Sequence, residues 1–161
     1  MGRIIPFGFG VVILLAVAAS LRPLEPFLLG YVCVIVALAI VSLLSFTQSR
    51  PHFYFGVLTV GILISIAATN WPMRIAYVAS SSSFERAASQ ILGGQKISTP
   101  CMVGAFRIAK AEVHYNGKVC FWTDCNPAGR TGFVQCGPVD PPFNLWSHTK
   151  LNNSWQFISE D

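Results

Sequence analysis

Residues 53–71 read Phe-Tyr-Phe-Gly-Val-Leu-Thr-Val-Gly-Ile-Leu-Ile-Ser-Ile-Ala-Ala-Thr-Asn-Trp. This stretch is the last of three apolar runs, and the polar half of the chain begins directly after it. Its length is close to the ~20 residues that an α-helix needs to cross the hydrocarbon core of a bilayer. We therefore interpret it as a third membrane helix, which tethers a small outer domain.

Two similar runs precede it, and neither residues 4–21 nor residues 26–49 contain a charged side chain. The predicted spans cover about residues 4–21, 27–47 and 53–71. Short connections that contain prolines predict an antiparallel three-helix bundle. A second interpretation of the first run is a cleaved signal peptide, with Arg3 before the apolar centre and Ala16-Val17-Ala18 as the cleavage site. The two runs that follow favour the membrane helix.

The composition of the whole chain is that of a membrane protein. Of its 161 residues, 53% are hydrophobic and 11% are charged, whereas about 25% are charged in a typical soluble domain. The apolar character is confined to residues 1–72, and residues 73–161 form the predicted extramembrane domain. The net charge of +4 is spread along the chain, unlike the clustered basic face that binds nucleic acid. The predicted partner is thus the lipid bilayer, with no nucleic acid.

The three runs contain no Asp, Glu, Lys, Arg or His. Ion pathways, proton relays and substrate sites within membranes normally contain such residues, so a pump, channel or transporter is disfavoured. In the third run Gly61, Ser65 and Thr69 recur every four residues on one helix face. Small residues allow close helix contact, and this face is the candidate for packing against the first two helices. Ordinary membrane-helix composition is the alternative explanation.

The orientation follows from the basic residues that flank the runs. Arg3 and Arg50 fall on one side, and Arg22 and Arg74 fall on the other, so the positive-inside rule gives nearly a tie. We favour an N-terminus inside the cell. Three spans then place the C-terminal domain outside the cytoplasm.

The polar half predicts a small α+β domain, with one helix on a mostly antiparallel sheet. Pro72 is expected to stop the membrane helix, and residues 73–79 are β-prone and predict a strand. Ser82 and Glu85 have the spacing of a capping box at the start of a helix. Gly93-Gly94 would end this helix, whose apolar stripe is Phe84, Ala87, Ala88, Ile91 and Leu92.

Strands are predicted over residues 103–115, 118–125, 131–137, 145–150 and 154–159. Asn116-Gly117 is a strong hairpin signal, because a two-residue turn of this type needs positive φ at both positions. Residues 126–130 predict the loop of a second hairpin.

Four motifs follow one another in the polar half, namely Gly104-Ala105-Phe106-Arg107-Ile108, the Asn116-Gly117 hairpin, Thr131-Gly132-Phe133-Val134, and the segment from Leu151 through Trp155 to Phe157. Their order resembles small bacterial multi-pass membrane proteins of unassigned function that carry a C-terminal α+β domain. The resemblance covers the polar half best. It implies this fold and a location in the bacterial inner membrane, but no catalytic residue. The four cysteines of the polar half are not part of the pattern.

The cysteines do not match a known site. Cys33 lies in the second apolar run, and the other four are Cys101, Cys120, Cys125 and Cys136. Only Cys120 and Cys125 are as close as the cysteine pairs of structural zinc sites. A thiol-redox role would need a C-x-x-C motif at a helix start, which is missing.

A disulfide is predicted instead. With residues 126–130 as the loop, counting along an antiparallel ladder places Trp122 opposite Val134 and Cys120 opposite Cys136. Opposed Cβ atoms lie about 4.5–5.5 Å apart, close to the range that a disulfide requires. A Cys120–Cys136 bond would persist on the oxidising side of the membrane.

No catalytic arrangement is evident, since His114, His148, Asp124 and Asp140 form no recognisable order with any Ser or Cys. We therefore expect no enzyme activity, no cofactor and no metal. The predicted function is that of a membrane-anchored structural or interaction protein, whose domain contacts another envelope protein or its own copies. The alternative is a ligand- or peptide-binding sensor of the cell envelope. Its cleft would be lined by aromatic residues that we first assign to the core, namely Phe121, Trp122, Phe133, Phe143, Trp146, Trp155 and Phe157.

Overall fold

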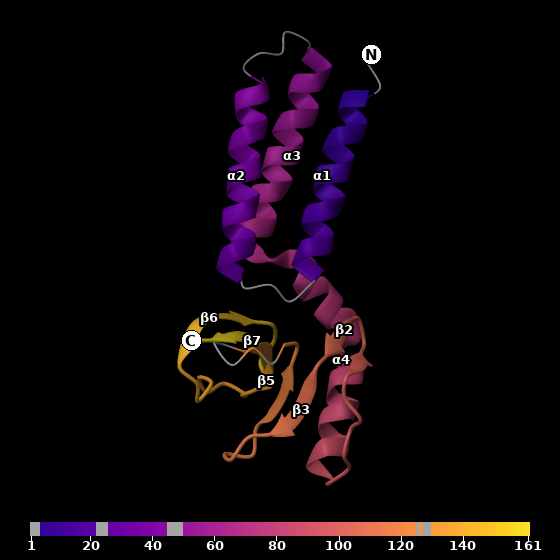
Figure 1. Cartoon of the computed structure of the whole chain (residues 1–161), viewed down its shortest axis with the longest axis vertical. Helices are drawn as coiled ribbons and strands as arrows, with labels where there is room; N and C mark the ends of the chain where they lie inside the picture. The colour runs from indigo at the N-terminus through magenta and orange to yellow at the C-terminus, as the bar shows by residue number, and fades with distance from the viewer. Residues whose placement is uncertain (1–3, 22–25, 45–49, 125, 127–129) are drawn as a thin grey trace. The chain divides into compact units, whose positions relative to one another are not determined.

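A computed structural model describes residues 4–21, 26–44, 50–124, 126 and 130–161. Within these residues, four α-helices are followed by seven β-strands (Figure 1). The chain divides into two compact parts, the helical unit (Met1–Met73) and the sheet unit (Arg74–Asp161). The division falls one residue beyond the predicted domain boundary.

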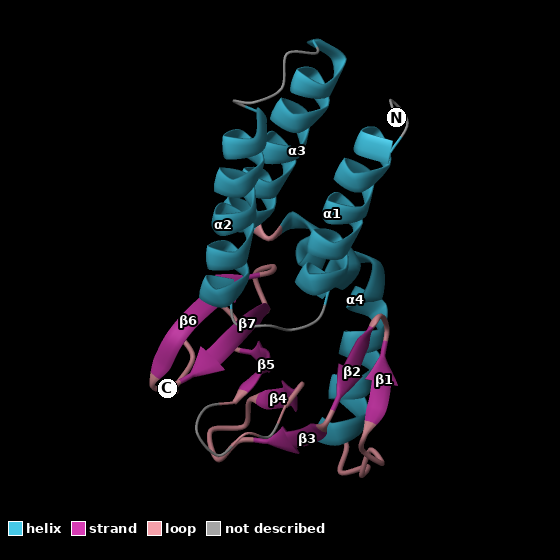
Figure 2. Ribbon diagram, turned by 45° about the horizontal axis from the view of Figure 1, so that its top comes forward, coloured by secondary structure: helices cyan, strands magenta, loops and turns pink. Residues whose placement is uncertain are grey.

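The helical unit contains α1 (Ile4–Leu21), α2 (Pro26–Leu44) and α3 (Arg50–Thr69). They follow the three apolar runs and lie side by side (Figures 1 and 2). Side chains of α1 such as Val12 and Ala16 pack from the side against a core contributed by α2 and α3. This buried core consists of Cys33, Ala37, Ile40, Leu63 and Ile66.

None of the described helices is by itself long and apolar enough to cross a membrane. Residues Phe53–Thr69 of α3 and the helix that follows, Trp71–Leu92, meet the requirement only as a pair, which is broken at Asn70. Two shorter apolar helices, Phe9–Ser20 and Gly30–Val41, lie within α1 and α2.

The buried face of α3 differs from the predicted one. Gly61, Ser65 and Thr69 are exposed, and a Cβ atom added at Gly61 would meet nothing within 4 Å. The prediction that they pack against α1 and α2 was wrong. The helix instead buries positions at alternating spacings of three and four residues, and Leu63 and Ile66 among them fill the core between the helices. The buried positions are Gly56, Thr59, Leu63, Ile66 and Asn70.

Asn70 separates α3 from α4 (Trp71–Leu92). Its φ of 46° is in the left-handed region, which Asn tolerates better than most residues. Its backbone N–H still donates to Ile66 O at 2.8 Å, and its side-chain Oδ1 accepts from the Ser20 hydroxyl of α1 at 2.5 Å. Both side chains are buried, so this pair fixes α1 to the break between α3 and α4.

The strand predicted over residues 73–79 does not exist, because α4 runs continuously through it. Pro72 lies in the first turn of α4, where no intrahelical partner is needed for the missing N–H. Ser82 and Glu85 are consequently in mid-helix and form no cap. One helical stripe is buried from end to end, and this burial outweighs the β-propensity of Ile75 and Val78. The stripe consists of Met73, Tyr77, Ser80, Phe84, Ala87 and Ala88. Gly93-Gly94 ends the helix as predicted, with Gly94 at φ 81°.

The predicted strand over residues 103–115 is divided into three. β1 (Cys101–Val103) and β2 (Phe106–Ile108) form a separate antiparallel pair joined by Gly104-Ala105, and β3 (Lys110–Val113) belongs to the main sheet. Gly104 has φ 60°, and a Cβ there would lie 2.2 Å from Cβ of Ser80. Only glycine fits this close approach to α4. The Ser80 hydroxyl also accepts from Ala105 N–H at 3.0 Å.

The main sheet is antiparallel, with strand order β3-β4-β5-β7-β6. Its other strands are β4 (Val119–Trp122), β5 (Thr131–Gln135), β6 (Leu145–Lys150) and β7 (Trp155–Glu160). The antiparallel α+β prediction is thus confirmed. β7 lies between β5 and β6, so β6 is an edge strand (Figure 2).

The Asn-Gly hairpin joins β3 to β4, as predicted, but with a different turn. His114 N–H donates to Lys118 O and Gly117 N–H donates to His114 O, both at 2.8 Å. Gly117 has φ 77°, whereas Asn116 does not have a positive φ. The connection is therefore a three-residue loop with glycine in the left-handed position, the next most common hairpin type.

Candidate functional site

Aromatic rings fill the interior of the sheet unit between α4 and the sheet. Phe84 of α4 is fully buried, and its ring centroid lies 4.8 Å from that of Phe133 and 5.3 Å from that of Trp155. Tyr77, Phe106 and Phe121 surround the same ring at 5.4, 5.9 and 5.7 Å. These edge-on contacts are the arrangement that aromatic rings prefer in a closed core.

The opposite face of the sheet is buried as well. Phe143 and Leu145, from the segment before β6 and from its first residue, cover this face. The segment that follows β5, predicted only as an irregular connection, therefore provides the second cover of the sheet. The buried cluster under it consists of Cys120, Trp122, Val134, Cys136 and Ile158.

Trp146 is the exception among the aromatic residues assigned to the core. Its side chain is 58% exposed, and it lies in β6 at a break in the register between Leu145 and Ser147. Together with His148 and Lys150 it forms the exposed row of this edge strand, which we call the β6 edge. Bulges and lysines are features that protect sheet edges against pairing with other strands. Contact with another molecule at this edge is therefore expected through the Trp146 side chain rather than through backbone pairing of β6.

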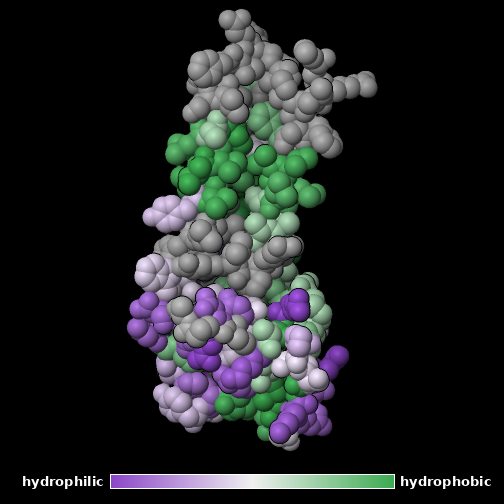
Figure 3. Space-filling view, viewed as in Figure 1, coloured by the Kyte–Doolittle hydropathy of each residue, from purple (hydrophilic) through white to green (hydrophobic). Residues whose placement is uncertain are grey.

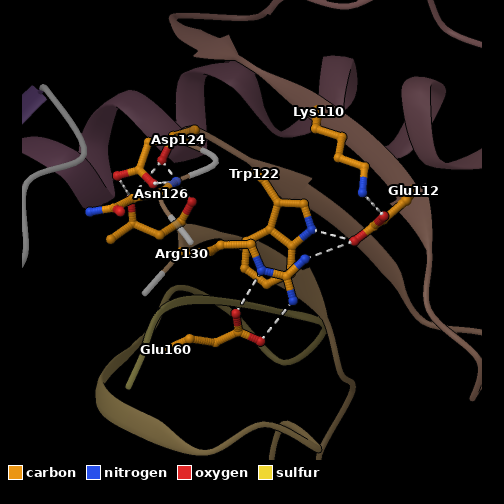
Figure 4. A network of polar contacts seen from close by, with 9 residues as sticks. Lys110, Glu112, Trp122, Asp124, Asn126, Arg130 and Glu160 are labelled. Carbon is orange, nitrogen blue, oxygen red and sulfur yellow. Dashed lines mark hydrogen bonds and ion pairs between the residues drawn. The ribbon is translucent and has the colours of Figure 1, made fainter. Parts of the chain in front are cut away.

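A network of polar contacts surrounds Arg130 (Figure 4). Its guanidinium carbon lies 4.1 Å from the centre of the Trp122 ring. Nε and Nη2 donate to the carboxylate of Glu160 at 2.7 and 3.0 Å, while Nη1 donates to Glu112 at 3.2 Å. The residues come from β3, β4, the end of the β4–β5 loop and β7, so the network joins these segments.

The carboxylate of Glu112 also contacts Trp122 and Lys110. It accepts from Trp122 Nε1 at 2.7 Å and pairs with Lys110 Nζ at 2.5 Å. Burial raises the pKa of Glu112, but the hydrogen bonds from Lys110 and Trp122 and the charges of Lys110 and Arg130 outweigh it. The pKa is therefore lowered from its ordinary value. A general acid needs the opposite shift, so this carboxylate is suited to hold the fold together rather than to transfer protons.

The register between β4 and β5 differs from the predicted one by two residues. Cys120 is opposite Val134, Trp122 is opposite Gly132, and Thr123 N–H donates to Thr131 O. The loop between the two strands is longer than predicted, because the pairing ends at Thr123 and Thr131. Within the loop, Asp124 accepts a hydrogen bond from the Thr131 hydroxyl at 3.2 Å.

Cys120 and Cys136 are consequently diagonal rather than directly opposed, although both belong to the same buried cluster. Their sulfurs are free thiols in this structure. A Cys120–Cys136 bond stays a prediction. Maleimide labelling of the unfolded chain before and after reduction tests it, and new labelling at these two positions only after reduction is expected if the bond exists.

The buried thiols are poorly suited to chemistry. Burial, with a further contribution from the charge of Glu112, raises the pKa of Cys120 to about 12. Burial also raises the pKa of Cys136. Since the thiolate is the nucleophile and the metal ligand, the raised pKa values reduce the thiolate fraction of both groups at neutral pH. Cys125 lies outside the described residues.

Among the described residues, no three His, Cys, Asp or Glu side chains converge as metal ligands. The ring of His114 contacts Phe143, with centroids 4.7 Å apart, and its Nδ1 lies 3.1 Å from Asn116 Oδ1. His148 is exposed on β6. The two histidines thus occupy unrelated places in the sheet unit.

Comparison with protein-family models, with curated proteins and with solved structures found no match. The resemblance to small multi-pass membrane proteins therefore rests on the sequence features alone.

Proposed function

We propose that the chain is a membrane-anchored interaction protein. Its three apolar helices hold the protein in the cytoplasmic membrane of a bacterium, and its sheet unit contacts another envelope protein or a second copy through the β6 edge. The orientation that we favour places the sheet unit outside the cytoplasm.

The observation that carries the proposal is the distribution of exposed apolar side chains in the helical unit. Leu14, Ile35 and Leu38 are 68%, 62% and 62% exposed, respectively. Large apolar side chains of α1 and α2 are thus exposed, and Figure 3 shows apolar residues gathered on the surface of the helical unit. A contiguous apolar surface of this kind is typical of contact with lipid or with another protein.

The closed aromatic core of the sheet unit favours a role in protein contact over a role in ligand binding. The rings around Phe84 pack on one another and are fully or almost fully buried, which leaves the aromatic residues little scope to line a ligand cleft. A sensor for a small ligand, the alternative function, would need Trp122 or Trp146 in an open pocket. Trp122 is fully buried, whereas Trp146 is exposed on an edge strand. Tryptophan is enriched among the residues that dominate protein interfaces.

The membrane part of the proposal is tested by fractionation of cells that express the full chain. We expect the protein in the membrane fraction after alkaline carbonate washing, with the sheet unit accessible to protease only from outside the cytoplasm. Extraction by carbonate would contradict the anchor, and protection from outside protease would contradict the orientation.

The interaction part is tested by chemical crosslinking in intact cells and capture in mild detergent. We expect Trp146→Ser to lose a crosslinked species that the wild type forms. Val139→Ser is the matched control, because Val139 is 62% exposed but lies outside the β6 edge. Equal crosslinking of the wild type and both variants would contradict a role of this edge.

A further inference from the structure

The outward face of α4 changes character along the helix. In its first two turns this face carries Arg74, Ile75, Val78 and Ala79, all of which are exposed. Further along, the same face carries the polar residues Ser82, Glu85, Arg86, Ser89 and Gln90, and the exposed Leu92 follows at the end of the helix. A surface helix of a soluble domain typically carries charged and polar residues on its exposed face. The adjacent exposed side chains of Ile75 and Val78 depart from this pattern in the first two turns.

The apolar part of this face is substantial. Ile75 and Val78 are 60% and 66% exposed, and they line a shallow hollow of about 340 Å³ together with Arg74 and Ala79. Removing such side chains from water is worth roughly 25 cal/mol per Å² of apolar area. Ile75 and Val78 would therefore be more stable in an apolar medium than in water.

Arg74 adds a positive charge at the edge of the apolar part. Its guanidinium forms no ion pair with any carboxylate that the structure describes. A long arginine stem can lie along an apolar surface while its charged end reaches a more polar layer. An apolar surface with one free cation is complementary to a phospholipid, which has acyl chains below an anionic phosphate.

The inward face of the same turns is fixed to the sheet unit. Ser80 accepts from Ala105 N–H, and Gly104 approaches Ser80 too closely for any side chain. Tyr77 is buried and its hydroxyl accepts from Asn152 Nδ2 at 2.8 Å. The outward face cannot turn inward without breaking these contacts, so within the sheet unit it is fixed on the side of α4 away from the sheet.

We propose that the first two turns of α4 form a lipid-docking face, with Ile75 and Val78 among the acyl chains and Arg74 at the phosphate of an anionic phospholipid. The face begins at Arg74, five residues after the end of α3 at Thr69. The inference rests on the proposed membrane anchor and deepens it, because it brings the sheet unit itself into contact with the bilayer.

The test uses the full chain in vesicles of phosphatidylcholine and phosphatidylglycerol in equal amounts. Val78 is replaced by the photoreactive amino acid benzoylphenylalanine, and lipid adducts are measured by mass spectrometry after irradiation. The matched control carries the same amino acid at Ser89, three turns further along the same face. We expect lipid adducts at position 78 and at least about tenfold fewer at position 89.

Arg74→Gln in the position-78 variant tests the headgroup contact. One basic residue near an anionic surface is worth about 1 kcal/mol, or roughly a fivefold preference. We expect phosphatidylglycerol adducts to exceed phosphatidylcholine adducts by about this factor, and the preference to disappear with Arg74→Gln. Equal labelling of both lipids with Arg74 present would overturn the assignment of the phosphate to Arg74.

A third probe separates this inference from the membrane anchor. Ile64 is 54% exposed on α3, in the helical unit. Lipid adducts at position 64 but not at position 78 would overturn the docking face and leave the anchor in place. The absence of adducts at both positions would contradict the anchor. Crosslinking of position 78 to a second copy of the chain would overturn the lipid assignment in favour of a protein contact.

Discussion

The two units of this chain use apolar side chains in opposite ways. In the helical unit a single helix, α3, buries Leu63 and Ile66 and exposes Leu58 and Ile64. In the sheet unit the central strands bury nearly every side chain, and the three ion pairs that the described residues form all lie there. The proposed membrane anchor accounts for the difference by two solvents, because an apolar surface is stable in lipid and a charged one in water.

Buried polar groups show the same contrast. Ser20 and Asn70 satisfy each other within the helical unit, where few other polar partners are available. In the sheet unit Glu112 has three donors and Glu160 has two from one guanidinium. We infer that packing of α1 and α2 on α3 dominates the stability of the first unit, and an aromatic core with a polar network dominates that of the second.

The largest expected effect is that of Phe84→Ala. This change leaves a cavity at the centre of the aromatic core and should lower the free energy of unfolding of the sheet unit by about 3–5 kcal/mol. It is measured by near-ultraviolet circular dichroism of the full chain during denaturation in detergent. Leu92→Ala is the control, because Leu92 is 56% exposed on the same helix. Equal effects of the two changes would show that Phe84 is not the centre of the core.

Arg130→Met should have the next largest effect. It removes both ion pairs of the guanidinium and leaves Glu160, with its side chain 16% exposed, without its partner. The expected loss is about 1–3 kcal/mol, the range for leaving a buried polar group unsatisfied. Lys150→Met, at an exposed position of β6, is the control. If both variants unfold at the same denaturant concentration, the network does not stabilise the sheet unit.

Glu112→Gln should have a smaller effect that depends on pH. Its folded-state pKa is lowered, so the charged form contributes stability above the ordinary value of 4.5, and this contribution is lost as the pH falls through the folded-state pKa. At pH 7 the variant should lose about 0.5–1 kcal/mol, as for a partly exposed ion pair. Below pH 4.5 the difference between the wild type and the variant should shrink. A difference that stays constant with pH would exclude the carboxylate charge as its cause.

The sequence predicts best those elements whose signal is local. The apolar runs predict α1 to α3, Gly93-Gly94 predicts the end of α4, and Asn116-Gly117 predicts the β3–β4 hairpin. The start of α4 was predicted as a strand because Ile75 and Val78 favour that structure locally. The buried stripe from Met73 to Ala88 favours a helix. It is evident only when the whole segment is considered as one element.

The candidate sites were harder to predict, because they depend on contacts between distant segments. A difference of two residues in the β4–β5 register moves Cys120 from a position opposite Cys136 to one opposite Val134. The Arg130 network joins residues of four segments, and no spacing along the chain reveals it. The exposure of Trp146 likewise follows from the position of β6 at the sheet edge, which depends on the strand order.

The smallest effect is expected for Gly61→Leu on α3. Gly61 is exposed and its added side chain would enter open space, so the free energy of unfolding of the helical unit in detergent should change by less than about 0.5 kcal/mol. Ser65 is left unchanged, because its hydroxyl accepts from Trp71 Nε1 at 2.9 Å. Ala37→Leu is the control. Ala37 is 5% exposed in the core of the helical unit, and overpacking there should cost about 1–3 kcal/mol. A loss at Gly61 as large as that at Ala37, accompanied by a change from oligomer to monomer, would show that the small-residue face packs against a second copy of the chain. The same loss without a change in oligomeric state would contradict the burial pattern of α3 and restore the face that the sequence first indicated.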